Sequence, residues 1–133
     1  MAIKRGGPVG GWKAGKRADL GDKRYRSAWE ANYARYLNWL KATGNIHHWE
    51  FEPDTFWFMQ IKRGVRSYLP DFKVWESPTA TPYYVEVKGW WDPKSLTKLK
   101  RMKKYYPDIR VDIVSRKEYN AIKRWSRLIP NWE

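Results

Sequence analysis

The sequence predicts an α/β protein in which a mixed central β-sheet of about four to five strands is flanked by helices. Segments with apolar residues at helical spacing alternate with short runs rich in β-branched and aromatic residues. One strand-like run is followed by a helical segment and then by another strand, and such a unit joins parallel strands through a right-handed crossover. Because two other strands are joined by a turn, we expect the sheet to be mixed.

The length of 133 residues fits one domain with a single core. Residues 1–23 are expected to form a flexible basic arm, because glycine and proline crowd its start and basic residues follow. Such an arm could wrap a phosphate backbone or be only a solvated terminus. Residues 24–133 then form the single domain. Hydrophobic residues make up 42% of the chain, so we expect this domain to fold rather than stay disordered.

The first helix is expected to begin after Ser27, where aromatic residues and leucines recur three and four positions apart, and to end at Gly44. Ser27 is suited to be the N-cap, and Glu30 would complete a capping box. A first strand follows over residues 46–58, interrupted by a bend at Pro53.

Residues 65–75 and 82–89 are expected to be the second and third strands, because each is rich in apolar and aromatic residues. The run 76–81 between them has the composition of a turn. A second helix is expected to open at Asp92 as N-cap, with Pro93 in its first turn, where a missing N–H has no cost.

Pro107 ends the second helix, and residues 109–114 alternate as a fourth strand. Ser115 and Glu118 then form a capping box for the last helix. The predicted order is therefore helix, three strands, helix, strand, helix.

The formal net charge of +13 and the pI near 10 point to a polyanionic partner, and nucleic acid is the leading class. A solubility effect or an anionic membrane would also suit the charge. However, no run of about 20 apolar residues could span a bilayer, and no signal peptide is visible. We therefore expect an intracellular protein without a membrane partner. The absence of cysteine excludes disulfides, cysteine-ligated zinc and thiol catalysis.

The residues that predict chemistry are Asp71, which follows a proline, and the pair Glu86 and Lys88 fifteen positions after it. Side chains alternate along a strand, so Glu86 and Lys88 project from the same face. Phosphodiester hydrolysis needs a cation beside the phosphate, and Mg²⁺ prefers a few carboxylate oxygens with waters retained. We expect Asp71 and Glu86 to supply these oxygens and Lys88 to orient the attacking water or contact the phosphate.

Two further groups could complete this site. The main-chain carbonyl of Val87 lies between the paired residues, and Glu30 could lean over the site from the first helix as a further ligand. Taken singly, an E-x-K pair is usually a solvated face, and Glu30 would be only a cap residue. Glu86 and Lys88, however, lie in an apolar strand, where charges without a partner are costly.

Four segments resemble, in order, parts of the Holliday-junction-resolving endonuclease I family of bacteriophages: YRSAWE (25–30), YLPDF (68–72), VEVKGW (85–90) and YPDIRVDIVS (106–115). This family belongs to the PD-(D/E)XK nuclease superfamily and is related to the archaeal-type junction resolvases. The resemblance implies a restriction-endonuclease-like sheet and a catalytic set of Glu30, Asp71, Glu86 and Lys88, with Ser27 as an auxiliary residue. It also implies Mg²⁺, with Mn²⁺ as a substitute, and a homodimer that makes paired nicks in four-way DNA junctions. If the protein is phage-encoded, as the resemblance suggests, it would act in the cytoplasm of the host cell.

Several other residues are expected to contact DNA rather than to catalyse. The candidates are Lys13, Lys16, Arg17, Lys98, Arg101 and Trp90. For Trp57, packing in a core or in a dimer is favoured over base stacking. His47 and His48 are adjacent in a strand, so they point to opposite faces and do not readily share one metal. Two alternatives to a junction resolvase stay open: a nuclease of the same superfamily with a repair, restriction or transposon-end target, and a non-catalytic DNA-binding protein.

Overall fold

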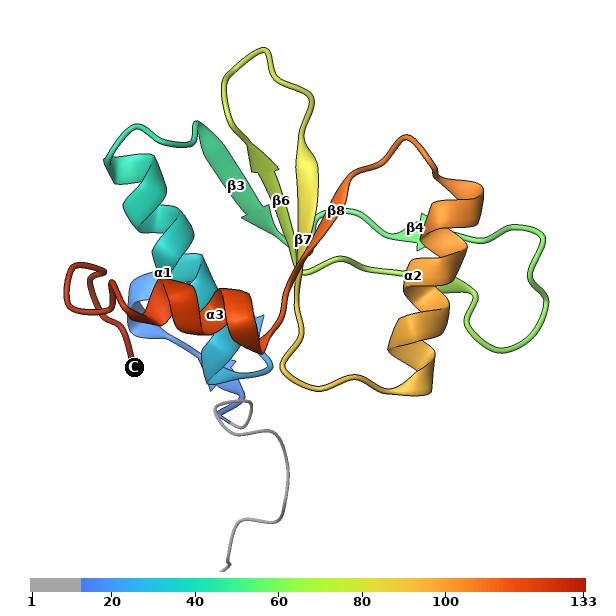
Figure 1. Cartoon of the computed structure of the whole chain (residues 1–133), viewed down its shortest axis with the longest axis horizontal. Helices are drawn as coiled ribbons and strands as arrows, with labels where there is room; N and C mark the ends of the chain where they lie inside the picture. The colour runs from blue at the N-terminus through green and yellow to red at the C-terminus, as the bar shows by residue number, and fades with distance from the viewer. Residues whose placement is uncertain (1–12) are drawn as a thin grey trace, which may run out of the picture.

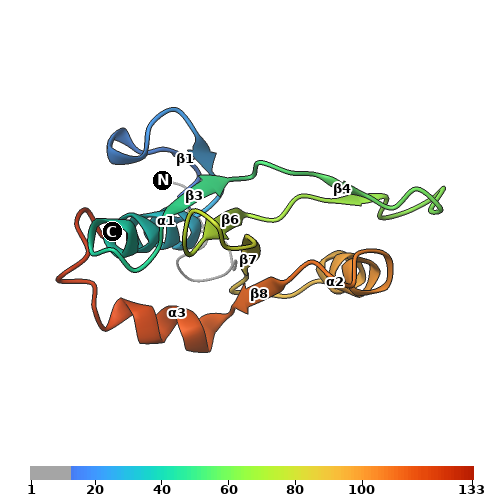
Figure 2. The same cartoon turned by 90° about the horizontal axis from the view of Figure 1, so that it is seen from above.

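The computed structural model describes residues 13–133 and confirms the predicted α/β class. In this part of the chain, a mixed sheet of four strands is flanked by three α-helices. Figure 1 shows α1 and α3 on one side of the sheet and α2 on the other, and Figure 2 shows the same arrangement from above. No helix within residues 13–133 is long and apolar enough to cross a membrane.

The sheet has the order β3-β6-β7-β8. Its strands are β3 (His48–Phe51), β6 (Phe72–Trp75), β7 (Tyr83–Val87) and β8 (Val111–Val114). The first three pair antiparallel, whereas β7 and β8 pair parallel. The helix α2 (Pro93–Tyr105) connects β7 to β8, so the predicted strand-helix-strand crossover is confirmed. Asp92 caps this helix by accepting a hydrogen bond of 2.7 Å from the Ser95 amide.

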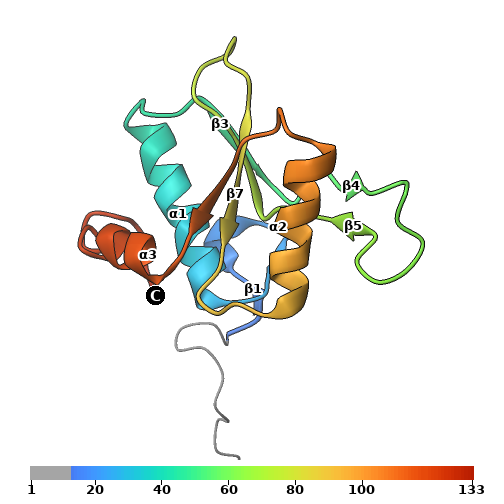
Figure 3. The same cartoon turned by 45° about the vertical axis from the view of Figure 1, so that its right-hand side comes forward.

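Two predicted strands are each split in the structure. The segment 46–58 divides into β3 and β4 (Phe56–Trp57), and the segment 65–75 divides into β5 (Ser67–Tyr68) and β6. Both breaks contain a proline, Pro53 or Pro70, and proline cannot donate a hydrogen bond to a sheet ladder. β4 and β5 pair with each other and leave the main sheet as a two-stranded projection (Figure 3), which we call the β4–β5 arm and define as residues 55–70.

Residues 13–23 differ from the flexible arm that the sequence suggests. β1 (Gly15–Lys16) pairs with β2 (Arg24–Tyr25), and the short 3-10 helix η1 (Ala18–Leu20) lies between them. Ion pairs hold this segment on the domain, because Asp19 bonds Arg35 and Arg17 bonds Glu133. The part of the predicted arm over residues 1–12 lies outside the described residues.

The main core lies between α1 (Ala28–Ala42) and the sheet, and α3 (Arg116–Lys123) adds Tyr119 to it. The Tyr119 ring stacks on Trp29 with 4.1 Å between ring centroids. The predicted capping box of the last helix is confirmed, since the Ser115 amide donates to Glu118 at 2.9 Å. A smaller core between α2 and the β4–β5 arm contains the buried side chains of Phe58, Tyr68 and Met102.

Candidate active site

The predicted catalytic carboxylates converge where α1 begins and where β6 and β7 separate. Glu30 lies in the first turn of α1, Asp71 directly precedes β6, and Glu86 lies on β7. Glu30 and Asp71 are buried, with 7% and 2% of their surface exposed. The folded chain therefore brings together three acidic residues that are distant in sequence.

A main-chain hydrogen bond fixes Asp71. Its Oδ2 accepts from the Val87 amide at 2.8 Å. The last residue pair between β6 and β7 is Phe72–Val85. Val87 is the next residue of β7 whose amide points toward β6, and the Asp71 carboxylate accepts the hydrogen bond of that amide. In a strand, the N–H and C=O of one residue point to the same side. The Val87 carbonyl is thus directed toward the edge that Asp71 occupies.

Electrostatics make this cluster unfavourable without a cation. Burial raises the pKa of Asp71 well above its usual range, and the negative charges of Glu86 and Glu30 raise it further. Burial also raises the pKa of Glu30, against the hydrogen bond from the Arg26 amide. The pKa of Glu86 is raised by burial as well, although the Tyr68 hydroxyl, 2.7 Å away, and Lys88 oppose the shift. Each carboxyl would be ionised more readily if a positive charge lay beside it.

Arg26 supplies one such charge, although nothing in its sequence context except its place next to Ser27 indicates this role. One guanidinium nitrogen, Nη1, lies 3.4 Å from Asp71 Oδ1 and 3.6 Å from Glu30 Oε2. Nη2 contacts Glu52, a further acidic residue that sequence reasoning missed. The Arg26 side chain is 60% exposed, so it can leave the cluster without disrupting the core.

Glu52 is held toward Arg26 by an unusual backbone. Its φ of 49° lies in the left-handed region, which is uncommon for a residue other than glycine. The Glu52 amide donates to the Asp71 carbonyl at 2.8 Å, which keeps the two acidic residues together. The only sequence signal is an acidic residue directly before Pro53, where the strand pattern breaks.

Ser27 and Glu30 also cap α1, as the sequence suggests, but not with the predicted geometry. The Ser27 hydroxyl accepts from the Glu30 amide at 3.1 Å. The Glu30 carboxylate accepts from the amide of Arg26 at 3.1 Å, one residue earlier than a capping box requires. Glu30 therefore has a structural role and also lies beside Asp71.

Lys88 lies between two hollows of the surface. One, of about 170 Å³, is lined by Arg26, Ser27, Glu30, Val87, Lys88 and Trp90, together with Trp29 and Gly89. The other, of about 30 Å³, is lined mainly by Tyr68, Glu86, Lys88, Trp91, Ser95 and Lys98. Lys88 directly follows β7 and lines this smaller hollow together with Glu86, as their spacing predicts. Lys98 also lies close enough to Glu86 to lower its pKa slightly against the effect of burial.

The residues expected to contact DNA fall into different environments. Lys13 and Lys16 are exposed, and Trp90 is 64% exposed beside the larger hollow. Arg17 instead donates to Glu133 at 2.7 Å, so its charge is compensated within the domain. Arg101 donates to the Val65 carbonyl and ties α2 to the β4–β5 arm.

The donor set suits a hard cation better than a zinc ion. In residues 13–133, no three His, Asp or Glu side chains come together closely enough to hold a metal by themselves. Mg²⁺ does not require three, because it commonly uses one or two carboxylates and keeps several waters. Asp71 and Glu86, with the Val87 carbonyl beside them, meet this requirement.

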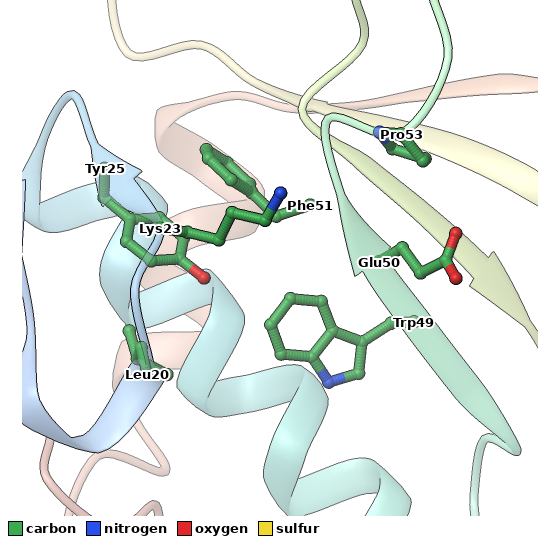
Figure 4. Close-up of a pocket in the computed structure, with 7 residues that line it drawn as sticks. All are labelled: Leu20, Lys23, Tyr25, Trp49, Glu50, Phe51 and Pro53. Atoms are coloured by element: carbon green, nitrogen blue, oxygen red, sulfur yellow. The ribbon is translucent and has the colours of Figure 1, made fainter.

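A larger hollow of about 390 Å³ lies between η1, β2 and β3 and contains none of the predicted catalytic residues. Figure 4 shows the rings of Tyr25, Phe51 and Trp49 around it, with the Lys23 side chain extending across. Burial raises the pKa of Tyr25 to about 12, so this phenol stays neutral and packs with the core.

Comparison of the chain with protein-family models, curated proteins and solved structures found no match.

Proposed function

We propose that this protein is a metal-dependent endodeoxyribonuclease that resolves four-way DNA junctions. The observation that carries the proposal is the cluster of the buried Glu30 and Asp71 with the partly buried Glu86, whose pKa values are all raised, and with Lys88 lining the same hollow as Glu86. Buried carboxyls that repel one another are costly for a fold and are typical of sites that receive a cation.

In this proposal, Asp71 and Glu86 hold Mg²⁺, or Mn²⁺ in its place, with the Val87 carbonyl as a further ligand. When bound, the ion would neutralise charge on the phosphate and polarise a water molecule. Lys88 orients the attacking water or contacts the phosphate. Glu30, positioned by its hydrogen bond from the Arg26 amide, organises water at the rim of the site.

DNA is the proposed substrate because the molecule carries a net charge of +13, and Arg26, Lys88 and Lys98 lie beside the carboxylate cluster. A four-way junction is proposed from the family that segments 25–30, 68–72, 85–90 and 106–115 resemble. Resolving a four-way junction takes paired nicks in two of its four strands and therefore two sites, so the active form is proposed to be a homodimer. Each subunit would then cut one strand.

The test is a cleavage assay on a four-way junction and on a linear duplex of the same sequence, with and without Mg²⁺. We expect Mg²⁺-dependent paired nicks in the junction, little cutting of the duplex, and loss of cleavage with retained binding in Asp71→Asn and Glu86→Gln. Asp108→Asn removes an exposed carboxylate elsewhere and serves as the control.

Each other result has a distinct meaning. Equal cutting of duplex and junction would indicate a nuclease with another target. Binding without nicking at any Mg²⁺ concentration would overturn the enzymatic assignment.

A further inference from the structure

The β4–β5 arm and α2 form one lobe beside the sheet. Their shared core is the cluster around Phe58, Tyr68 and Met102. Two hydrogen bonds join the main chain of the arm to side chains of α2 and of Tyr106, which directly follows it. The Tyr106 hydroxyl donates to the Trp57 carbonyl at 2.6 Å, and Arg101 donates to the Val65 carbonyl. Figure 3 shows the arm projecting past α2, away from the sheet. These contacts hold the arm on the helix in a defined position.

The charge of this lobe is entirely positive over both elements. Residues 55–70 contain no Asp or Glu but carry Lys62, Arg63 and Arg66. The helix α2 also lacks acidic residues, and its basic residues are Lys94, Lys98, Lys100, Arg101, Lys103 and Lys104. In the part of the chain that the structure describes, none of these side chains forms a salt bridge with a carboxylate.

In the rest of the described chain, only some of the arginines are paired with carboxylates. Arg17, Arg26, Arg35 and Arg110 each pair with at least one carboxylate. Arg24, Arg116, Arg124 and Arg127 lie outside the lobe and also form no salt bridge within the described residues. What distinguishes the lobe is that its two elements carry nine basic residues and no acidic residue. A like-charged surface of this kind favours a polyanion that can be contacted at several points.

Two large apolar side chains point outward from the arm. Trp57 is 54% exposed and Met59 is 82% exposed. Phe56 and Phe58 pack in the core of the lobe, whereas Trp57 at the end of β4 and Met59 in the turn that follows are exposed to solvent. An exposed tryptophan can stack on a base, and a methionine can insert at an unstacked base step.

We propose that this lobe binds DNA next to the cleavage site, with its basic residues on the phosphates and with Trp57 and Met59 against bases that are unstacked at a branch point. This inference rests on the proposed function and assigns it a substrate-binding surface. The lobe is continuous with the site, because Lys98 of α2 lines the same hollow as Glu86 and Lys88. A second copy of the chain is a poorer partner, since a twofold interface would set this positive surface against itself.

The test measures binding without Mg²⁺, in EDTA, by fluorescence anisotropy on a four-way junction and a linear duplex at several salt concentrations. The variant Lys62→Ala/Arg63→Ala/Arg66→Ala is compared with Lys117→Ala/Lys123→Ala/Arg124→Ala, which removes the same charge from α3 and the residue after it. For the arm variant, we expect affinity for both DNAs to fall at least about tenfold and the salt slope to fall by about three. The α3 variant should change both much less. Equal losses in the two variants would overturn the assignment to the lobe.

A second variant tests the apolar residues. Trp57→Ala/Met59→Ala should weaken junction binding by about tenfold and duplex binding much less, because only the junction offers unstacked bases. Thermal unfolding of each variant checks that the fold is intact. Unchanged affinity for the junction would overturn the role of the two side chains.

Two other outcomes would assign the lobe to a different partner. A lower sedimentation mass in either arm variant, with unchanged DNA affinity, would make the lobe a dimer interface. Loss of binding to vesicles of phosphatidylserine and phosphatidylcholine, with unchanged DNA affinity, would make it a membrane surface. Because binding is measured without Mg²⁺, a chain that binds DNA through the lobe but never nicks it would overturn only the proposed function.

Discussion

The main-chain amide of Val87 donates a hydrogen bond of 2.8 Å to the carboxylate of Asp71, at the point where the β6–β7 ladder ends. The bond holds a side chain that is only 3% exposed at the end of the two inner strands of the sheet. A charged group in this position loses hydration, and the bond replaces only part of it. The site therefore carries an electrostatic cost that a bound cation would relieve.

Removing the charge of Asp71 should raise stability at neutral pH. The folded-state pKa of Asp71 is raised, mainly by burial. Between the ordinary carboxyl pKa and this raised value, the folded chain binds more protons than the unfolded chain, so stability falls as pH rises through that window. The Asp71→Asn side chain does not ionise, so this variant avoids the loss of stability. Its amide oxygen can still accept the hydrogen bond from the Val87 amide. Thermal unfolding from about pH 3 to about pH 8 should show that Asp71→Asn is more stable than wild type at neutral pH and that the difference disappears at low pH. An Asp71→Asn variant less stable than wild type at neutral pH, with Asp108→Asn unchanged, would contradict the prediction.

Mg²⁺ should stabilise the wild-type protein and not Asp71→Asn. An ion that binds only the folded state adds about 2.7 kcal/mol when its concentration is 100 times its Kd. The effect should grow as pH rises, because the carboxyls must lose protons to bind the ion. Unfolding is followed with and without Mg²⁺ at constant ionic strength. Equal stabilisation of both proteins would place the ion elsewhere.

Arg26→Ala should destabilise the metal-free protein, because the guanidinium contacts Asp71, Glu30 and Glu52. The Arg26 side chain is 60% exposed, so solvent screens these pairs and the expected loss is about 1 kcal/mol or less. Mg²⁺ should restore most of that loss, because it neutralises the same carboxylates. Arg24→Ala, which removes an exposed arginine from β2 just before Arg26, is the control. A loss that Mg²⁺ does not reduce would show that Arg26 acts through packing alone.

Local patterns predicted most of the elements in this fold. Helical spacing and the Ser27 cap place α1, and Asp92-Pro93 opens α2 where the structure has it. The crossover from β7 to β8 follows from the order of elements. The β4–β5 arm could not be predicted from these patterns. A proline inside an apolar run indicates a bend, but it does not indicate whether the two halves of the run stay in one sheet.

The site was predictable only where its residues follow the period of a strand. Glu86 and Lys88 line one hollow because of their spacing, and Asp71 precedes the neighbouring strand. Arg26 and Glu52 reach the cluster through a helix cap and a left-handed backbone. Neither feature produces a periodic pattern in the sequence. The contact of Arg26 and Glu52 with the cluster depends on tertiary packing, which such patterns do not predict.

Gly89→Ala should destabilise the protein by overpacking. A Cβ at Gly89 would lie 2.7 Å from Cζ3 of Trp29, and that ring is held by its stacking on Tyr119. Extra atoms in a well-packed core typically cost about 1–3 kcal/mol. Denaturant unfolding gives the value, and a double-mutant cycle with Trp29→Leu tests the cause. If the cost of Gly89→Ala is the same in both backgrounds, the clash with Trp29 is not its origin.

Tyr68→Phe should shift the acid limb of the cleavage profile to higher pH. The Tyr68 hydroxyl donates to Glu86 Oε1 at 2.7 Å and lowers the pKa of that carboxyl against the effect of burial. Without the hydroxyl, the Glu86 pKa rises further, so more alkaline conditions are needed to ionise it for metal binding. The rate at high pH, where Glu86 is ionised in both proteins, should return close to the wild-type value.

The matched control for this prediction is Tyr84→Phe, which removes a hydroxyl that bonds Asp54 outside the site. It should leave the profile in place while testing the general effect of losing a phenol next to a carboxylate. The readout is the initial rate of junction cleavage at saturating Mg²⁺ across the pH range. A Tyr68→Phe profile that superimposes on wild type would mean that ionisation of Glu86 does not limit cleavage. Equal shifts in both variants would mean that the effect does not come from the site.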